Sequence, residues 1–471
     1  MNKRSFIISL LIIVFIRVVL AALCPPVADE SYYMIWHKYL DWSYVDHPGM
    51  IAWINYLFNQ VIKDTLFAVR SVALFLYFIS ILFIYKSVFL ISENKEKSYL
   101  SAIIFALIPY NLIVGITMQV EQPLLAFTAI VTFYYLMLLK TESRKMFYYI
   151  AFFSALGTLS KYTMLVVTGS YFLFILFNNR YRILMFSKEF FLSIFLYLGM
   201  MFPIVYWNMN NKLQSLAFHS GRFEGVSFQY IPDFLLNATL YASPVLIFLF
   251  ILSLKRKVYK KSPYMRDLIL LCLLVFITFL IVSFKVKVWG HWVAVMYVPL
   301  SIVVAVGLYE IRSKILYWMT GFSGVLLLFL LFISPGVIFN VNDLLSNYRI
   351  AQGIESIRSE VAGQVHIYAD FHGSAGQLTY YGNTRVYLPL GVFKKVDRWG
   401  EAQFALWGTA LIDRGDTVLY YGDNDPVTKS KLEAFFTSVS VVSDYKLRVL
   451  EPHINKKVMY LCEGSELSFN F

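Results

Sequence analysis

Charged residues are scarce in this sequence of 471 amino acids, where Asp, Glu, Lys and Arg together make up 15% of the chain. Soluble globular domains carry about a quarter charged residues. Hydrophobic residues make up 59%, and many lie in runs of roughly 18 residues, which are long enough to cross a bilayer as helices. The shortage of charge excludes an ordinary soluble protein and predicts a polytopic α-helical membrane protein.

Cysteine is also rare, with only Cys24, Cys272 and Cys462 in the chain. The three lie far apart and form no CxxC pair, which indicates neither a disulfide framework nor a zinc site. Cys24 follows an N-terminal apolar run, as it would in a lipoprotein signal. Because Leu23 occupies the preceding position, where such a signal needs a small residue, we interpret the run as an uncleaved signal-anchor.

Acidic residues are outnumbered, at 29 against 41 basic residues, and the net charge is +12. The basic residues lie in short clusters between apolar runs, as the positive-inside bias predicts, and this distribution argues against nucleic-acid binding. If every cluster faces the cytoplasm, an even number of spans separates each cluster from the next. The clusters are residues 2–4, 93–97, 142–145, 178–182, 254–261 and 312–314.

The apolar runs predict about eleven membrane spans, a number that satisfies this parity. We interpret residues 146–177 as two short spans that meet near Lys161, because a single span would place two basic clusters outside. The predicted spans are Phe6–Leu23, Leu66–Ile91, Leu100–Met118, Pro123–Leu139, Met146–Leu159, Tyr162–Phe177, Phe190–Trp207, Leu235–Leu254, Leu268–Phe284, Trp292–Tyr309 and Ile315–Ile333.

The chain after Ile333 has a different pattern. Five short segments predict strands, and Pro426–Val439 predicts an amphipathic helix. We expect a membrane domain at residues 1–334, whose first outer loop at 24–65 holds the active site, and a soluble α/β domain at residues 335–471. By parity this domain lies outside the cytoplasm. The strand segments are QVHIYAD, TRVYLPL, DTVLYYG, YKLRVL and KVMYLC.

With this topology, the unusual polar residues fall on the outer side of the membrane. Charge at the rim of a helix bundle is costly and tends to be functional. Their confinement to one face therefore predicts a polar site at the membrane surface. The residues are Asp29, Glu30, Asp46 and His47 in the first outer loop, Glu121 and Lys161 at later turns, and Trp207, Asn208, His219, Arg222, His291 and Trp292 in the last two outer loops.

Each of these residues has a structural alternative. Asp29 and Glu121 are placed to cap helices. Lys161 is placed to snorkel toward a lipid headgroup, and Asp46-His47-Pro48 is a typical turn sequence. The tryptophans at positions 36, 42, 53 and 207 fit an interfacial aromatic belt.

The stretch ADESYYMIWHKYLDWSYVDHPGMIAW resembles the first outer loop of bacterial protein-mannosyltransferase-like glycosyltransferases. This C-type superfamily includes the aminoarabinose transferase that modifies lipid A, and its pattern is Asp-Glu, an aromatic pair, Trp and then Gly-Tyr-x-Asp-His-Pro-Pro. The segments MQVEQPLLAF, GTLSKYTML, PIVYWNMNNKLQSLAFHSGR, WGHW and KKVDRWG resemble later motifs in the same order. Ser43, Gly49, Glu121 and His291 depart from the pattern, which bears on the sugar and the acceptor more than on the fold.

The resemblance implies a glycosyltransferase that moves a sugar from a polyprenyl-phosphate carrier to an acceptor outside the cytoplasm. It implies that Asp29 is the general base or acceptor anchor, that Glu30 orients nearby groups, and that Glu121 is a second catalytic carboxylate. Lys161 and Arg222 would face the donor phosphate. Substrate-binding roles would fall to Tyr33, Asp46, His47, Trp207, Asn208, His219, His291 and Trp292. The residues define no cofactor, and a divalent metal is left open because no ligand spacing specifies one.

The expected acceptor is lipid A or another envelope glycan, and the expected location is the bacterial inner membrane with the active site and tail domain in the periplasm. Protein O-mannosylation is the alternative. A flippase for lipid-linked sugars is a second alternative, although its polar residues would lie at mid-membrane in paired broken helices. A polysaccharide polymerase or ligase also acts outside, but the Asp-Glu pair after the first span favours the glycosyltransferase.

Overall fold

The computed structural model describes residues 3–23, 26–61, 66–220, 228–309, 354, 365–382, 384–389, 401–408, 411–442, 457–465 and 469–470. The chain divides into two compact units. We call residues 1–23 with 41–330 the membrane unit, and residues 24–40 with 331–471 the tail unit.

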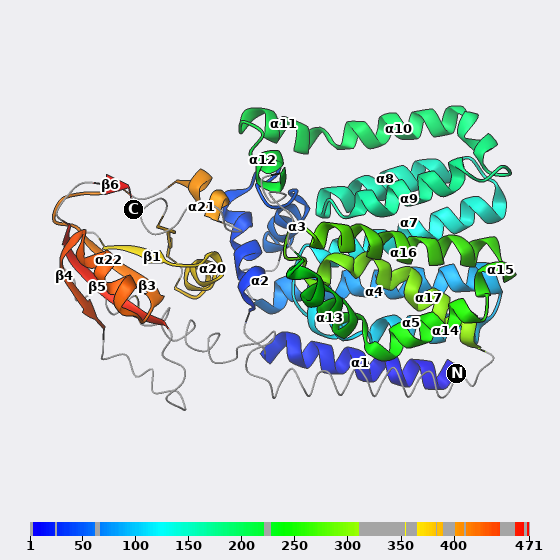
Figure 1. Ribbon diagram of the computed structural model, residues 1–471, viewed down its shortest axis with the longest axis horizontal. Coiled ribbons are helices and arrows are strands. Elements are labelled where there is room, and N and C mark those ends of the chain that lie inside the picture. Colours follow the sequence, from blue (N-terminus) through cyan, green and yellow to red (C-terminus); the bar gives the residue numbers. More distant parts are fainter. Residues whose placement is uncertain are drawn as a thin grey trace. The chain divides into compact units, whose positions relative to one another are not determined.

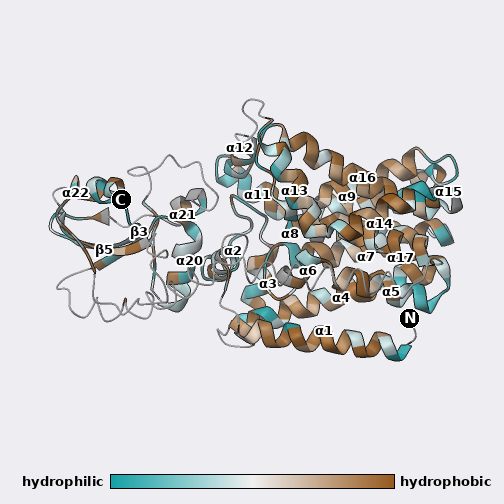
Figure 2. Cartoon of the chain, turned by 60° about the horizontal axis from the view of Figure 1, so that its bottom comes forward, coloured by the Kyte–Doolittle hydropathy of each residue, from teal (hydrophilic) through white to brown (hydrophobic). Residues whose placement is uncertain are grey.

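The membrane unit is helical, and its longer helices lie side by side along their length (Figure 1). Apolar residues cover these helices, and hydrophilic residues gather at α12 and α15 (Figure 2). Its helices are α1 Lys3–Leu23, α3 Met50–Asn59, α4 Leu66–Ser92, α5 Lys95–Ala106, α6 Pro109–Val114, α7 Glu121–Thr141, α8 Met146–Ser160, α9 Met164–Leu176, α10 Lys188–Met200, α11 Phe202–Asn210, α12 Gln214–Ser220, α13 Tyr230–Ala242, α14 Pro244–Lys255, α15 Val258–Lys261, α16 Pro263–Ser283 and α17 Tyr297–Leu308, with the 3-10 helices η2 Arg182–Phe186 and η4 Gly290–Met296.

Six helices among the described residues are long and apolar enough to cross a membrane, or seven if α13 and α14 form one bent span. The shorter apolar helices α8 and α9 follow one another and are separated at Lys161, as predicted. The predicted fold class, a polytopic helical membrane protein with a small C-terminal sheet domain, is confirmed. The predicted span at Ile315–Ile333 lies outside the described residues.

The predicted span at Leu100–Met118 is broken in the structure. Helix α5 ends at Ala106 and α6 begins at Pro109, whose nitrogen has no hydrogen to donate. The missing N–H would have bonded to the Phe105 carbonyl, which accepts from Asn111 Nδ2 at 2.8 Å. The Ala106 carbonyl accepts from the Arg17 guanidinium of α1 at 3.3 Å and from the Tyr77 hydroxyl of α4 at 3.3 Å. Arg17 also donates to the Asn111 carbonyl at 2.6 Å. Side chains of Arg17, Tyr77 and Asn111 therefore satisfy the carbonyls at the break.

The predicted span at Leu235–Leu254 is bent rather than straight. Helices α13 and α14 meet at 90°. Ser243 lies at the bend with φ 84°, and Pro244 begins the second helix. The Ser243 hydroxyl accepts from the Leu246 N–H at 3.5 Å, which caps α14.

The tail unit combines a small sheet with short helices. The four-stranded sheet has the order β1-β3-β5-β4, in which β1 and β3 are parallel and the other pairs are antiparallel. Tyr368, Val418, Tyr460 and Cys462 form part of its apolar core. Its elements are α2 Ala28–Ile35, the 3-10 helix η1 Trp36–Tyr39, β1 Val365–Ala369, α20 His372–Tyr381, α21 Glu401–Trp407, β2 Leu411–Ile412, β3 Thr417–Asp423, α22 Pro426–Glu433, β4 Phe436–Val441, β5 Lys457–Ser465 and β6 Phe469–Asn470.

Three of the five predicted tail strands form β1, β3 and β5. TRVYLPL contributes an isolated bridge from Tyr387 to Tyr368 rather than a strand, and YKLRVL lies outside the described residues. The helix predicted at Pro426–Val439 was too long, because α22 ends at Glu433 and Phe436–Val441 is strand β4. Its aromatic and β-branched residues suit a pleated surface, where Phe436 is buried.

Candidate active site

Glu121 and Lys161 form a buried ion pair in the membrane unit. Glu121 is the first residue of α7, and Lys161 follows the last residue of α8. Lys161 Nζ lies 2.5 Å from Glu121 Oε1, and the two side chains are only 6% and 3% exposed. The capping alternative for Glu121 is therefore wrong, because Val120 is the N-cap of α7. The snorkelling alternative for Lys161 is also wrong, because its ammonium group is buried against a carboxylate.

His291 adds a third polar group to this pair. It lies on η4, and its Nε2 is 3.8 Å from Glu121 Oε1. Its ring is stacked with that of Tyr110 on α6, at a centroid distance of 6.2 Å. The next residue, Trp292, packs edge-on against Phe279 at 6.0 Å. The structure thus brings Glu121, Lys161 and His291 together from three separate parts of the chain.

Asp46 and His47 lie in a tight turn, as the turn alternative predicted, and both are buried. Tyr44 N–H donates to the His47 carbonyl at 3.1 Å, and Ser43 bridges to Pro48. The Asp46 carbonyl lies 3.1 Å from His219 Nε2 on α12. Burial raises the pKa of the Tyr44 hydroxyl, which keeps it neutral at physiological pH.

Tyr162 connects this turn region to the ion pair, because it follows Lys161 directly in sequence. Its ring lies edge-on to His219 at 5.4 Å, and its hydroxyl lies 3.3 Å from Ser215 Oγ. Sequence reasoning missed Tyr162, although it belongs to the quoted GTLSKYTML segment.

Trp207 on α11 is buried, so the belt reading is wrong for it. Its indole Nε1 donates to Asp41 Oδ2 at 2.7 Å, and Trp53 Nε1 donates to the Asp41 carbonyl at 2.9 Å. Asp41 therefore joins the segment before α3 to α11, a role that sequence reasoning missed. Asn208 donates to the Ile204 carbonyl of its own helix at 2.9 Å.

Asp29, Glu30 and Tyr33 belong to α2 of the tail unit. Glu30 and Tyr33 are buried, whereas Asp29 is exposed. The N-cap of α2 is Val27, so the capping alternative for Asp29 is wrong. Because these residues and Glu121 lie in different units, their convergence on one site stays a prediction. Arg222 lies outside the described residues.

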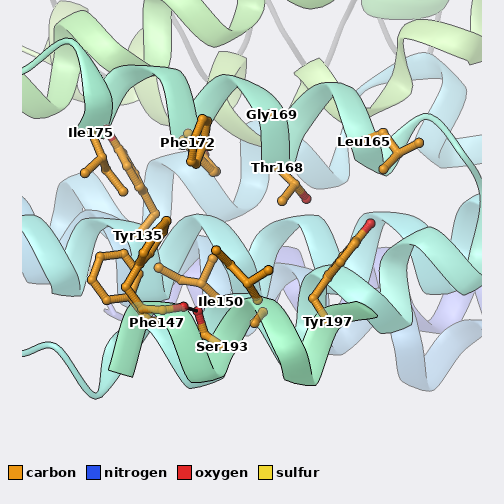
Figure 3. A pocket seen from close by; sticks show the side chains of 14 residues that line it. Tyr135, Phe147, Ile150, Leu165, Thr168, Gly169, Phe172, Ile175, Ser193 and Tyr197 are labelled. Atoms are coloured by element: carbon orange, nitrogen blue, oxygen red, sulfur yellow. Dashed lines mark hydrogen bonds between the residues drawn. The ribbon is translucent and has the colours of Figure 1, made fainter. Parts of the chain in front are cut away.

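An apolar cavity of about 300 Å³ lies among α7, α8, α9 and α10 (Figure 3). Leu165, Thr168 and Tyr197 line one part of it, and Tyr135, Phe147 and Ile175 line another (Figure 3). Leu165 is four residues after Lys161 along the chain, and Ile175 is about 15 Å further down α9 at the rise of an α-helix. The cavity therefore follows α9 away from the ion pair.

No group of three or more His, Cys, Asp or Glu side chains converges within the part of the chain that the structure describes. The ion pair and its neighbours are instead suited to charge stabilisation and proton transfer. A carboxylate can accept a proton or stabilise positive charge, and an ammonium can bind an anion.

Residues 46–207 match the family model of dolichyl-phosphate-mannose-protein mannosyltransferases, a segment that contains both members of the ion pair. No curated protein matches the sequence. The structure is similar to that of ArnT from Cupriavidus metallidurans bound to undecaprenyl phosphate, with a TM-score of 0.67, 11% identity and 98% coverage of both chains. For the apo state of the same protein, the TM-score is 0.61 and the identity 12%, over 97% of this chain and 98% of that one. The predicted resemblance to C-type glycosyltransferases is confirmed at the level of the fold.

Proposed function

We propose that this chain is an integral-membrane glycosyltransferase of a bacterial inner membrane, and that it moves a sugar from a polyprenyl-phosphate donor to an extracytoplasmic acceptor. The observation that supports this best is the buried Glu121–Lys161 pair at the ends of two apolar helices. Burying two charges is expensive, and charged groups in membrane helices tend to be kept for function. The ArnT structure with this fold contains undecaprenyl phosphate.

The reaction requires one bond to form and one to break at the anomeric carbon. The acceptor hydroxyl oxygen attacks this carbon, the bond from the carbon to the phosphate oxygen breaks, and polyprenyl phosphate leaves. Asp29 takes the hydroxyl proton, and Glu30 orients the segment. Lys161, of whose three N–H groups Glu121 uses one, and Arg222 offset charge on the leaving phosphate. Glu121 stabilises positive charge on the sugar.

The remaining candidate residues are assigned to substrate binding. His291 lies 3.8 Å from Glu121, and Trp292 is the next residue in the chain. Asp46 and His47 lie in one turn, and the Asp46 carbonyl contacts His219. Tyr33, Trp207 and Asn208 complete the set.

The isoprenoid chain of the donor is assigned to the cavity among α7–α10. Its apolar lining suits a hydrocarbon chain (Figure 3). Leu165, one of the lining residues, is four residues after Lys161 in the chain. Gly169 lines the cavity, and a Cβ there would meet no atom within 4 Å. Gly169→Phe should therefore fill the cavity and raise the KM for the lipid donor at least tenfold. Gly199→Phe is the matched control, since Gly199 on α10 has equal space and does not line the cavity.

The proposed acceptor is lipid A or another envelope glycan. Protein O-mannosylation is the second candidate, favoured by the description of the matching family model. Purified protein in nanodiscs would receive undecaprenyl phosphate carrying radiolabelled mannose or aminoarabinose, together with lipid A and a Ser/Thr-rich peptide. We expect label in the lipid A fraction. Labelled peptide would favour O-mannosylation, and donor translocation without any product would favour the flippase.

The proposed orientation can be tested with engineered cysteines at exposed positions. In a background without the native cysteines, cysteines at Lys212 and Val427 should react with an impermeant thiol reagent in cells with a permeable outer barrier. Cysteines at Arg144 and Lys257 should react only after lysis. Labelling at Lys257 in intact cells would contradict the proposed topology.

A further inference from the structure

We propose that His372, on α20 of the tail unit, is a positioning residue that orients the Asp29 carboxylate for the reaction. This inference rests on the proposed function, in which Asp29 accepts the proton of the acceptor. In this arrangement, a residue from the C-terminal region of the chain holds the catalytic carboxylate in place. No motif in the sequence marks His372, which begins the segment HGSAGQ.

The imidazole and the carboxylate face each other at close range. His372 Nε2 lies 3.7 Å from Asp29 Oδ1. This is the distance of an ion pair, and it is longer than a hydrogen bond. His372 is 7% exposed and Asp29 is 52% exposed. A buried, fixed imidazole thus lies behind a carboxylate that a substrate can approach from solvent.

The surroundings of His372 determine which nitrogen carries the proton. The imidazole ring contacts the rings of Phe371 and Tyr32, at centroid distances of 4.2 Å and 5.1 Å. Its Nδ1 is buried and makes no hydrogen bond within the described residues. A proton on Nδ1 would be buried without an acceptor, which is costly. The favoured neutral tautomer therefore carries its proton on Nε2, which faces Asp29 and can donate to it.

Helix α20 is held against α2 at two further points. Gln377 Nε2 donates to the Pro26 carbonyl at 2.8 Å. A Cβ on Gly376 would lie 2.8 Å from the Tyr32 nitrogen and 2.9 Å from the Ser31 carbonyl carbon, so the two backbones touch there. These contacts lie on either side of Asp29 along the chain. His372 is one turn before Gly376 and therefore on the same face of α20.

The tail unit contains a second histidine–carboxylate pair that provides a matched control. His366 Nε2 on β1 lies 3.8 Å from Asp416 Oδ2. The chemistry and the distance are nearly the same, but neither residue is a candidate for the reaction. If both pairs had a purely structural role, His372→Ala and His366→Ala should change kcat equally.

The test uses the full-length protein in nanodiscs with the undecaprenyl-phosphate sugar and acceptor that the wild type uses. His372→Ala should lower kcat roughly 10²-fold, the scale of a misplaced catalytic group, with little change in the donor KM. His372→Gln should restore part of the rate, because its amide can donate to Asp29. His366→Ala should keep wild-type kcat. In an Asp29→Asn background, His372→Ala should cause no further loss, because it acts through the carboxylate.

Two results would overturn the inference. One is wild-type kcat for His372→Ala. The other is a double variant whose loss of kcat equals the product of the losses caused by His372→Ala and Asp29→Asn separately. Thermal unfolding of the wild type, His372→Ala, Asp29→Asn and the double variant tests the contact without any turnover. A non-additive shift of the melting temperature supports the pair, and an additive shift contradicts it. A wild type that transfers no sugar would refute the proposed function but leave this unfolding cycle interpretable.

Discussion

Replacing Lys161 with methionine should strongly destabilise the membrane unit. The lysine and Glu121 side chains are 6% and 3% exposed, and their charged atoms are 2.5 Å apart. Methionine keeps much of the length of the side chain but leaves the Glu121 carboxylate buried without its cation. Removing one partner of a buried ion pair typically costs about 3–5 kcal/mol. His291, at 3.8 Å, is a weaker partner that is left in place.

The double variant Lys161→Met with Glu121→Gln separates stability from catalysis. It removes both charges, so no uncompensated charge remains. Because the attraction of a buried pair is largely offset by the desolvation of its members, the double variant should unfold near the wild-type free energy. Sugar transfer should still be lost, since the proposed reaction needs both charges. Stability that returns without activity would be the signature of a functional pair.

The measurements are unfolding in detergent and sugar transfer in nanodiscs. Lys140→Met is the control, because Lys140 forms a 2.9 Å pair with Glu93 in which the side chains are 36% and 78% exposed. Such an exposed pair contributes little, so this variant should change neither quantity appreciably. The reasoning fails if Lys161→Met unfolds like the wild type, or if the double variant is as unstable as the single one.

Three further predictions concern the tail unit. Asp29→Asn should lower sugar transfer roughly a hundredfold or more with unchanged donor binding, because it removes a base and because Val27 is the cap of α2; wild-type turnover in a radiolabel assay would exclude Asp29 from the reaction. Gly376→Val should push α20 off the Tyr32 backbone and cost about 1–3 kcal/mol, the usual scale of overpacking; an unchanged melting temperature would show that the helices do not touch there. Backbone hydrogen bonds at the start of α22, above all from Thr428, lower the pKa of Asp425, so its stabilising effect is present at neutral pH and lost as the pH falls through that lowered pKa. Asparagine caps about as well without titrating, so Asp425→Asn should flatten the acid limb of melting temperature against pH, and a limb like that of the wild type would contradict the assignment.

The membrane spans could be predicted where their boundaries depend on local sequence. Apolar runs and basic clusters placed two short helices on either side of Lys161, as the structure has them. The break before Pro109 and the bend at Pro244 were missed, although both prolines are visible. Membrane helices often tolerate proline, because other groups satisfy the freed backbone. At the first break, two of the groups that bond the freed carbonyls are Arg17 and Tyr77, which come from distant helices and are not evident from the local pattern.

The candidate site could be predicted residue by residue, but its contacts could not. The resemblance marked Glu121, Lys161 and His291 separately. Only the packing of α7, α8 and η4 shows that Lys161 and His291 both lie close to the Glu121 carboxylate. Lys161 alone was as consistent with a lipid-facing lysine. The helix predicted through Val439 failed for a similar reason: a strand partner, β5, decides the conformation of Phe436–Val441.

The candidate residues are divided between the two units, and this division has a kinetic consequence. The membrane unit holds the ion pair and the apolar cavity, which are assigned to the donor phosphate and its lipid chain. The tail unit holds Asp29 with His372, which are assigned to the proton of the acceptor. Substitutions in the cavity should therefore act on the donor KM, whereas substitutions at Asp29 and His372 should act on kcat. If His372→Ala raised the donor KM and left kcat unchanged, the tail unit would take part in donor binding, and the assignment of His372 as the residue that orients Asp29 would have to be abandoned.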